Sequence, residues 1–376
     1  MYITKVRIEN FRNIKHAELE FDRRLNVFAG KNAQGKTNLM EALSVCLGGS
    51  FRRSRFSQFV PAGEKNADVS VKLWFKDDNT ERENIVEYTV SKNMVTVKHN
   101  GLKMKDAAEL YGVLKYVVFI PEHLTLIKGQ PELRRAYLDD VAVMQTRTHL
   151  EKLSRYNKGL RQRNNILGSI RPDTDASLLS AQLAPWNDVL AREGVNVTYG
   201  RLNYFRFLKE YAADIYADLT GGTERLEMEY NSSVFNTESI DFKQSDKLYT
   251  EYISHLEQGL EAEMKLRYTV TGVHRDDVSF FVNGMTARDF ASQGQLRSAA
   301  LALKLSEAEM IRQRNRTCPV VILDDILSEL DAMRREYVIN HIDNSQVFIT
   351  CCNINDLSTL NNGKAWTTEN GAFSEM

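Results

Sequence analysis

Apolar and polar residues alternate through much of the N-terminal part of the chain. This period of two predicts half-buried β-strands. It appears at Ala17, Leu19 and Phe21, and again at Val69, Val71, Leu73 and Phe75. Residues 25–29 form another strand-like run, which leads into a glycine loop and an amphipathic helix, and Asn100-Gly101 predicts a hairpin turn. We therefore expect strands in this part, with an antiparallel sheet over residues 69–101.

From about residue 131 the apolar positions recur at helical spacing. The first face of this kind contains Leu133, Tyr137, Leu138 and Val141. The helical pattern continues to about Leu219, where Gly221-Gly222 interrupts it. A strand is expected next, over residues 226–230, and then a helix. That helix has apolar residues four positions apart at Leu248, Tyr252, Leu256 and Leu260.

Strands and helices alternate in the last part of the chain. A turn is expected at Asn283-Gly284, a helix from Gln295, and strands over residues 320–323 and 346–350. Together these patterns predict an α/β fold with two lobes. Residues 1–125 and 300–376 would form an α/β lobe with a mixed sheet, and residues 126–299 a mostly helical lobe.

The composition is that of a folded globular protein with no excess of positive charge. Of the 376 residues, 43% are hydrophobic and 26% are charged. Lys and Arg total 49 and Asp and Glu total 50, which gives a net charge of −1. Any DNA binding would therefore depend on local basic patches.

Three features favour a reduced cytoplasmic protein with no membrane partner. Charged residues occur throughout the N-terminal segment, which lacks the apolar core of a signal peptide. The longest apolar runs, such as residues 116–120 and 320–323, are far shorter than the ~20 residues that span a bilayer. No C-x-x-C pair occurs, which excludes a zinc knuckle and a disulfide scaffold. The four cysteines are Cys46, Cys318, Cys351 and Cys352.

Residues 30–37, GKNAQGKT, match the phosphate-binding pattern G-x-x-x-x-G-K-[ST]. The glycines of such a loop let backbone N–H groups surround a phosphate, the lysine reaches the terminal phosphates, and the threonine hydroxyl binds Mg²⁺. A chance glycine turn is the alternative, but a strand before the loop and a helix after it favour nucleotide binding. The candidate nucleotide ligands are Gly30, Lys31, Asn32, Ala33, Gln34, Gly35, Lys36 and Thr37, and Lys36 is also a candidate catalytic residue.

Residues 320–325, VVILDD, form an apolar run that ends in two aspartates. In P-loop enzymes a buried strand of this kind supplies a carboxylate to the magnesium shell, and Asp324 is the candidate for this role. Asp325 is then a candidate general base beside the attacking water. A buried strand that ends at a solvated acidic turn is the alternative.

Residues 292–295, SQGQ, stand directly before a helical pattern. Ser292 is a candidate cap for this helix, whose positive N-terminal end would face an anion, with Gly294 and Gln295 beside it. The alternative is an ordinary helix start. The order of a glycine loop, a long insert, S-x-G-Q, an acidic strand end and residues 328–331, SELD, resembles the order of motifs in the ABC-type ATPases.

The chain further resembles the RecF family, bacterial recombination mediators related to the SMC-type ATPases. The resemblance rests on five segments: residues 8–13 (IENFRN), 119–139 (with Pro121-Glu122, Arg134-Arg135 and Leu138-Asp139), 162–164 (QRN), 272–277 (GVHRDD) and 323–331 (LDDILSELD). In the fourth, Val273 stands where the family usually has proline. No catalytic role is expected for this fourth segment, in which His274 would be packed or hydrogen-bonded.

This resemblance implies an ATPase head of two lobes without a long coiled-coil arm. ATP with Mg²⁺ would bind between two protomers, with the glycine loop and Asp324 of one facing Ser292 of the other. Arg12 would contact the nucleotide, and Asp331 would lie at the interface of an ATP-dependent homodimer. The homodimer would clamp DNA at single-strand gaps and act with RecR, RecO and RecA. A weak, DNA-stimulated ATPase would serve as a switch.

Several groups of basic residues are candidates for contact with DNA. Basic candidates are Arg52, Arg53 and Arg55, the pair Arg134 and Arg135, and further along Arg161 and Arg163. The alternative for each group is a solvated face with salt bridges. Two other functions stay open beside the DNA clamp, namely a nucleotide-binding subunit of an ABC transporter and a P-loop phosphotransferase. The lack of a histidine in Cys351-Cys352, after the strand at 346–350, disfavours the transporter.

Overall fold

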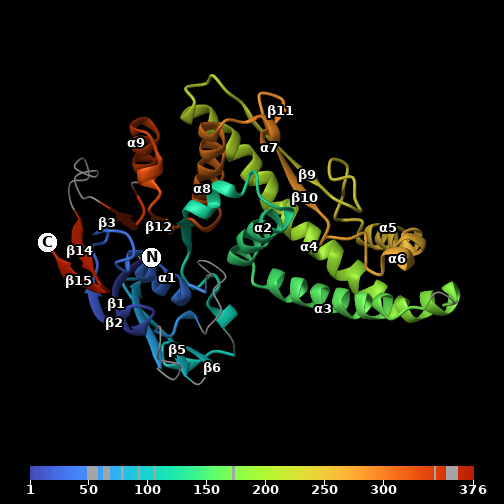
Figure 1. The fold of residues 1–376 in the computed structure, drawn as a ribbon, viewed down its shortest axis with the longest axis horizontal. Helices are drawn as coiled ribbons and strands as arrows, with labels where there is room; N and C mark the ends of the chain where they lie inside the picture. Colours follow the sequence, from blue (N-terminus) through green and yellow to red (C-terminus); the bar gives the residue numbers. More distant parts are fainter. Residues whose placement is uncertain are drawn as a thin grey trace. The chain divides into compact units, whose positions relative to one another are not determined.

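The computed structural model describes residues 1–48, 58–61, 68–77, 80–91, 94–105, 107–171, 174–342, 344–352 and 363–376. The chain divides into two compact units, and each is assembled from separate stretches of sequence (Figure 1). Unit 1 comprises Met1–Thr125, Asp218–Gly221 and Ala300–Met376, and unit 2 comprises Leu126–Ala217 and Gly222–Ala299. In the described ranges no helix is both long and apolar enough to cross a bilayer.

A six-stranded, mostly parallel sheet forms the centre of unit 1. Its order is β15-β14-β3-β13-β12-β8, and only the β14–β15 pair is antiparallel. The bounds are β3 Leu25–Ala29, β8 Tyr116–Phe119, β12 Val320–Asp324, β13 Val347–Cys351, β14 Lys364–Glu369 and β15 Ala372–Glu375. Every residue of β12 and β13 is buried, which explains why these strands are continuous apolar runs and not alternating ones.

A second sheet of unit 1 is antiparallel, as predicted for residues 69–101, and also includes β1 and β2; its order is β2-β1-β4-β5-β6-β7. Its strands are β1 Tyr2–Phe11, β2 Ile14–Glu20, β4 Val69–Lys76, β5 Glu83–Ser91, β6 Met94–His99 and β7 Leu102–Lys103. The predicted turn at Asn100-Gly101 joins β6 to β7. Helix α1 (Lys36–Cys46) contacts strands of both sheets and buries Leu39, Leu43 and Cys46.

Unit 1 also contains helix α9 (Ala332–His341) and the 3-10 turns η2 (Ala107–Leu110), η3 (Pro121–Thr125) and η4 (Leu327–Glu329).

Unit 2 is mostly helical. Its helices are α2 Pro131–Gln145, α3 Thr148–Gly168, α4 Ala176–Leu219, α5 Ser245–Gln258, α6 Leu260–Leu266, α7 Ala287–Phe290 and α8 Gln293–Asn315, of which α4 and α8 also extend into unit 1. Strands β9 (Leu226–Asn231), β10 (Asp277–Val282) and β11 (Met285–Thr286) form a small antiparallel sheet. One buried cluster includes Tyr156, Leu190, Val197, Tyr252 and Leu256.

Two sequence-based expectations need correction. The helix expected to run through Leu260 is two helices, α5 and α6, which meet at Gly259. Leu133 is 42% exposed and does not belong to the buried face of α2. Strands β14 and β15 were not predicted. They complete the parallel sheet because β14 pairs with β3, more than 300 positions earlier in the chain, and Trp366 stacks on Phe28 with ring centroids 4.7 Å apart.

Candidate nucleotide-binding site

The glycine loop connects β3 to α1 and lies close to β14. A side chain at Gly30 would collide with the carbonyl oxygen of Thr368, so only glycine fits there. Gly35 has a φ of 115°, a value that favours glycine, and is the residue directly before α1. The two glycines therefore shape a tight loop whose backbone leads directly into the N-terminus of a helix.

Lys36 is the first residue of α1 and is only 6% exposed. Its Nζ donates hydrogen bonds to the carbonyl oxygens of Gly30 and Lys31, at 2.5 and 2.9 Å. No acidic residue occupies the first turn of α1. An ammonium group and the free N–H groups of a helix N-terminus thus meet at one place, which is an arrangement suited to phosphate.

The acidic end of β12 faces this helix. The Asp324 carboxylate is 1% exposed, and its Oδ1 accepts hydrogen bonds from the Thr37 hydroxyl at 3.0 Å and the Thr350 hydroxyl at 2.8 Å. Asp325 has a φ of 55°, and the Ser328 hydroxyl donates to its carbonyl oxygen and to its Oδ1. Two successive aspartates therefore have different environments, because Asp324 is buried against α1 and Asp325 is turned toward the glycine loop.

A hollow of about 220 Å³ lies over the glycine loop. Its lining residues are Asn32, Ala33, Gln34, Gly35, Lys36, Thr37, Asn38, Asp325 and Thr350. The hollow lies within unit 1 and brings together the loop and the acidic strand end, which are about 290 positions apart in the sequence. The donor set fits a triphosphate, because backbone N–H groups and an ammonium converge at the loop.

The same region also fits Mg²⁺, in the manner usual for nucleotide sites. Among the described residues no group of three or more His, Cys, Asp or Glu side chains is arranged to hold a metal ion unaided. Mg²⁺ in nucleotide sites takes one or two protein oxygens and completes its shell with water and phosphate oxygens. Thr37 and Asp324 offer such a pair, since their oxygen atoms are 3.0 Å apart.

Arg12 lies beside α1 and not among the residues that line the hollow. Its guanidinium forms an ion pair with Glu41, a residue of α1 that is 2% exposed, and its Nη2 donates to Glu41 Oε1 at 2.9 Å. Its φ of 51° and the hydrogen bond from its N–H to Phe59 fix the backbone. In this structure Arg12 therefore anchors the strand β1 end to the nucleotide-loop helix, and a direct nucleotide contact stays a prediction.

Ser292 caps helix α8, as its place in the sequence suggested. Its hydroxyl accepts a hydrogen bond from the N–H of Gln295 at 3.2 Å, and Gln295 Oε1 accepts one from the N–H of Ser292 at 2.8 Å. This reciprocal arrangement is a capping box. Gln295 also donates to Glu224 at 2.9 Å, and the carbonyl of Gly294 accepts from Ser298. Ser292 is exposed and belongs to unit 2.

Two of the basic residues proposed to contact DNA are engaged inside unit 2. Arg134 is 4% exposed and forms two hydrogen bonds with the carboxylate of Asp277, at 2.7 and 2.9 Å. Arg135 donates to the carbonyl of Asp276 and pairs with Glu132. Burial argues against a DNA contact by Arg134 and equally by Arg163, which is fully buried beside Glu263. The cluster Arg52, Arg53 and Arg55 lies outside the described residues.

The segment 272–277 organises the interior of unit 2. Asp276 accepts hydrogen bonds from the Tyr230 hydroxyl at 2.7 Å and the N–H of Ser233 at 2.9 Å, and burial raises its pKa. The ring of His274 bonds to the Tyr156 hydroxyl at 2.8 Å and the carbonyl of Thr269 at 3.1 Å. Burial lowers the pKa of His274 to about 4, so the ring is neutral at pH 7. This segment therefore bonds to both β9 and α3 of unit 2.

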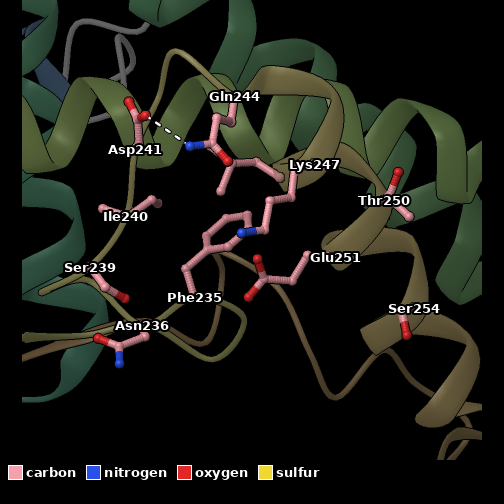
Figure 2. A pocket seen from close by; sticks show the side chains of 11 residues that line it. Phe235, Asn236, Ser239, Ile240, Asp241, Gln244, Lys247, Thr250, Glu251 and Ser254 are labelled. Carbon is pink, nitrogen blue, oxygen red and sulfur yellow. Dashed lines mark hydrogen bonds between the residues drawn. The ribbon is translucent and has the colours of Figure 1, made fainter.

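A larger hollow, of about 540 Å³, lies in unit 2 between α5 and the segment before it (Figure 2). Phe235, Ile240 and Leu248 supply its apolar lining, and Asp241, Lys247 and Glu251 line it with charges of both signs. Asp241 bonds to Gln244 at 3.1 Å. This mixed lining does not point to one class of ligand, whereas the donors of the hollow over the glycine loop fit a triphosphate.

Some residues of the site in unit 1 were not found from the sequence. The sequence places Thr350 only at the end of a strand, yet its hydroxyl contacts both Asp324 and the backbone of Asp325. Ser328 belongs to the SELD motif, which does not indicate its bond to Asp325. Both contacts depend on which strands are neighbours, which the hydrophobic pattern does not specify.

The fold and the site together define a class of protein. A mixed sheet whose strand β3 leads through a glycine loop into α1, beside an acidic strand end, belongs to the ABC-type P-loop ATPase heads. Comparison with an Smc head bound to the C-winged helix domain of ScpA supports this fold, with a TM-score of 0.57 at 17% identity over 100% of this chain and 97% of the other.

Residues 2–374 match the family described as RecF/RecN/SMC N terminal domain. The chain is 34% identical over 375 residues to the DNA replication and repair protein RecF of Bacillus mycoides (strain KBAB4), covering 99% of this chain and 98% of the relative. A solved structure described as the recombination mediator protein RecF-ATPrS in the RecFOR pathway is 31% identical, with a TM-score of 0.90 over 100% of this chain and 98% of the other. The chain belongs to the RecF family.

Proposed function

We propose that this protein is an ATP-dependent DNA-binding protein of recombinational repair and replication. The observation that carries the nucleotide part is the hollow in which Lys36, Thr37 and Asp325 surround one space. Similarity over the full chain to a DNA replication and repair protein supports the DNA part. The same similarity favours the DNA clamp over the transporter subunit and the phosphotransferase.

In this proposal each residue of the hollow has a distinct task. Lys36 and the N–H groups of the loop bind phosphate oxygens, and Thr37 with Asp324 holds Mg²⁺. Bound ATP with Mg²⁺ supplies a phosphoryl group that water can attack. Asp325 is the general base, because its carboxylate borders the hollow beside the loop. Among the interactions described, this carboxylate forms no ion pair. Hydrolysis is weak, is stimulated by DNA and acts as a switch.

We assign the ATPase role to unit 1 and the signature role to unit 2. Ser292, Gly294 and Gln295 lie at the start of α8, where Ser292 is exposed and the N-terminal end of the helix suits a phosphate on a second protomer. The protein would therefore form a homodimer only when ATP is present, with Asp331 at the interface. The dimer would hold DNA at single-strand gaps and act with RecR and RecO to favour RecA loading.

The test is DNA-binding anisotropy on a gapped duplex at one fixed salt concentration, without nucleotide, with ADP and with ATP. We expect tight binding only with ATP, and its loss together with dimerisation in Ser292→Arg. Ser169→Arg is the matched control, because it introduces the same charge in place of another exposed serine of unit 2. Ser169 lies at the C-terminal end of α3, whereas Ser292 lies at the N-terminal end of α8. Binding that is indifferent to nucleotide and to Ser292 would contradict the proposal.

A further inference from the structure

Thr350 occupies a junction between the two aspartates of the site. It lies on β13, is 1% exposed, and pairs in register with Asp324 on the parallel strand β12. Its hydroxyl donates to Asp324 Oδ1 at 2.8 Å and accepts from the N–H of Asp325 at 2.9 Å. One hydroxyl therefore uses both its donor and its acceptor capacity on successive residues.

The two bonds have different consequences. On the Asp324 side, Oδ1 also accepts from Thr37, so two hydroxyls from different elements orient one carboxylate. On the Asp325 side, the backbone has a φ of 55°, a conformation that residues other than glycine seldom adopt. The bond to Thr350 satisfies the N–H of this residue and holds the turn that directs the Asp325 side chain to the hollow.

We propose that Thr350 is a positioning residue for the nucleotide chemistry of this site. Its hydroxyl directs the carboxylate of Asp324 toward Thr37 and locks the turn that presents Asp325 to the glycine loop. Thr350 thus couples the metal-side and water-side carboxylates through a single group. The proposal rests on the proposed ATPase function and adds to it a residue outside the glycine loop and the acidic pair.

The decisive variant is Thr350→Val, which preserves the shape and strand preference of the side chain and replaces the hydroxyl with a methyl group. Thr368→Val is the matched control. Thr368 lies in the same sheet, on β14, is 4% exposed, and its hydroxyl has no hydrogen-bond partner in the part of the chain that the structure describes. Thr350→Ser is the rescue variant, because it restores the hydroxyl without the methyl group.

Two readouts separate positioning from a structural role. The first is the affinity for a fluorescent ATP analogue with Mg²⁺ and with a chelator, and the second is single-turnover hydrolysis. In Thr350→Val we expect the gain in affinity that Mg²⁺ gives to fall roughly tenfold and turnover to slow at least as much, the size expected for one hydrogen bond to a charged group. Affinity in the chelator stays that of the wild type. Thr350→Ser restores both quantities, and Thr368→Val changes neither.

Three results would overturn the proposal. The Mg²⁺-dependent gain and turnover of Thr350→Val could equal those of the wild type, its affinity could fall equally with and without Mg²⁺, or Thr368→Val could have the same effect. If Thr350→Val does not fold, Thr350→Ala removes the same hydroxyl without the branched side chain and is judged by the same criteria. A wild-type protein that binds no ATP would instead refute the proposed function, and the role of Thr350 with it.

Discussion

Two pairs of successive aspartates, Asp324-Asp325 and Asp276-Asp277, look alike in the sequence but have different environments in the structure. The first pair lies at the end of the buried strand β12 of unit 1, and in the bonds described its carboxylates accept from hydroxyl groups, next to a hollow. The second pair lies at the start of β10 in unit 2, where Asp277 is the first residue of the strand. Asp276 accepts from Tyr230 and Ser233, and Asp277 is paired with the buried Arg134.

The clearest difference is the arginine that pairs with Asp277. Hydroxyl groups orient a carboxylate without neutralising its charge, so the carboxylate can still bind a cation or accept a proton. A bidentate arginine consumes both oxygen atoms, and a buried pair of this kind is costly to break. An Asp-Asp pair at a strand end therefore indicates a catalytic or metal-binding role only where its neighbours do not neutralise the charge of the carboxylates.

The largest effect is expected for Asp325→Asn. Asparagine tolerates the same positive φ as aspartate but cannot accept the proton of an attacking water. Single-turnover hydrolysis should slow by roughly 10²–10⁴-fold, the usual contribution of a general base. Hydrogen exchange in both units should stay that of the wild type. Hydrolysis within twofold of the wild-type rate would remove Asp325 from the mechanism.

A companion variant tests the length of the same side chain. Asp325 is one methylene shorter than the glutamate found in transporter ATPases, and Asp325→Glu should therefore speed single-turnover hydrolysis. No change, or a loss, would mean that the shorter carboxylate does not set the rate.

Asp277→Asn should damage the fold of unit 2 and spare the site of unit 1. Removal of this charge leaves the buried guanidinium of Arg134 uncompensated, at a cost of about 3 kcal/mol. We expect faster hydrogen exchange of the backbone amides of α2 and β10. The control is Glu261→Gln, which breaks an exposed pair with Lys265 on α6 and should leave exchange unchanged. Equal protection in the two variants would mean that the Arg134 pair does not stabilise unit 2.

Acid should weaken unit 2 through His274. Its pKa is lowered to about 4 in the folded protein because the ring is buried, so between about pH 6.5 and pH 4 the unfolded chain binds more protons than the folded one. Stability is therefore lost as the pH falls through this window, by about 2 kcal/mol between pH 7 and pH 5.

The measurement is hydrogen exchange of α3 and α5 amides at the two pH values, corrected for intrinsic rates. His274→Gln should remove this part of the pH dependence. The same slope in the variant would assign the acid sensitivity to another group. Below this window Asp139 adds a second loss. Its burial alone would raise its pKa, but the charge of Arg201 holds the pKa at about 2.

The smallest effect is expected at Asp331, which combines a visible structural role with a predicted interface role. Its carboxylate caps α9 by accepting from the N–H of Arg334 at 2.9 Å. Asp331→Ala should destabilise α9 by about 1 kcal/mol, whereas Asp331→Ser keeps a cap. Hydrogen exchange of α9 measures this difference. ATP-dependent dimerisation lost in Asp331→Ser, where the cap is retained, would identify an interface role; dimerisation unchanged in this variant would contradict one.

Local signals were sufficient for much of the fold and for the centre of the site. The strand, glycine loop and helix of residues 25–46 and the apolar strand before Asp324 follow from short-range pattern and glycine placement. The strands after residue 363 did not follow, because β14 is stabilised by pairing with β3 and by the stacking of Trp366 on Phe28. No local sequence pattern indicates a strand partner so far away in the chain.

Arginine was the residue type for which sequence reasoning was least reliable. Arg134 and Arg163 stand in polar helical segments and resemble a solvated basic face, but their partners Asp277 and Glu263 lie more than 90 positions away. Thr350 was missed for the same reason, since its hydroxyl gains a role only when β13 lies beside β12. Side-chain chemistry was predictable where the motif itself contains the partner, as in the capping box of Ser292 and Gln295.

The most direct test of the nucleotide site is a calorimetric titration of ATP, with Mg²⁺, into the wild-type protein, Lys36→Ala and Lys265→Ala. Lys36 donates within the loop, whereas Lys265 is exposed on α6, so only the first should matter. We expect the wild type and Lys265→Ala to bind ATP equally. Lys36→Ala should bind roughly tenfold to a hundredfold more weakly, as expected for loss of a charge-assisted hydrogen bond. Equal binding by all three proteins, or no binding by the wild type, would contradict a nucleotide site at this loop.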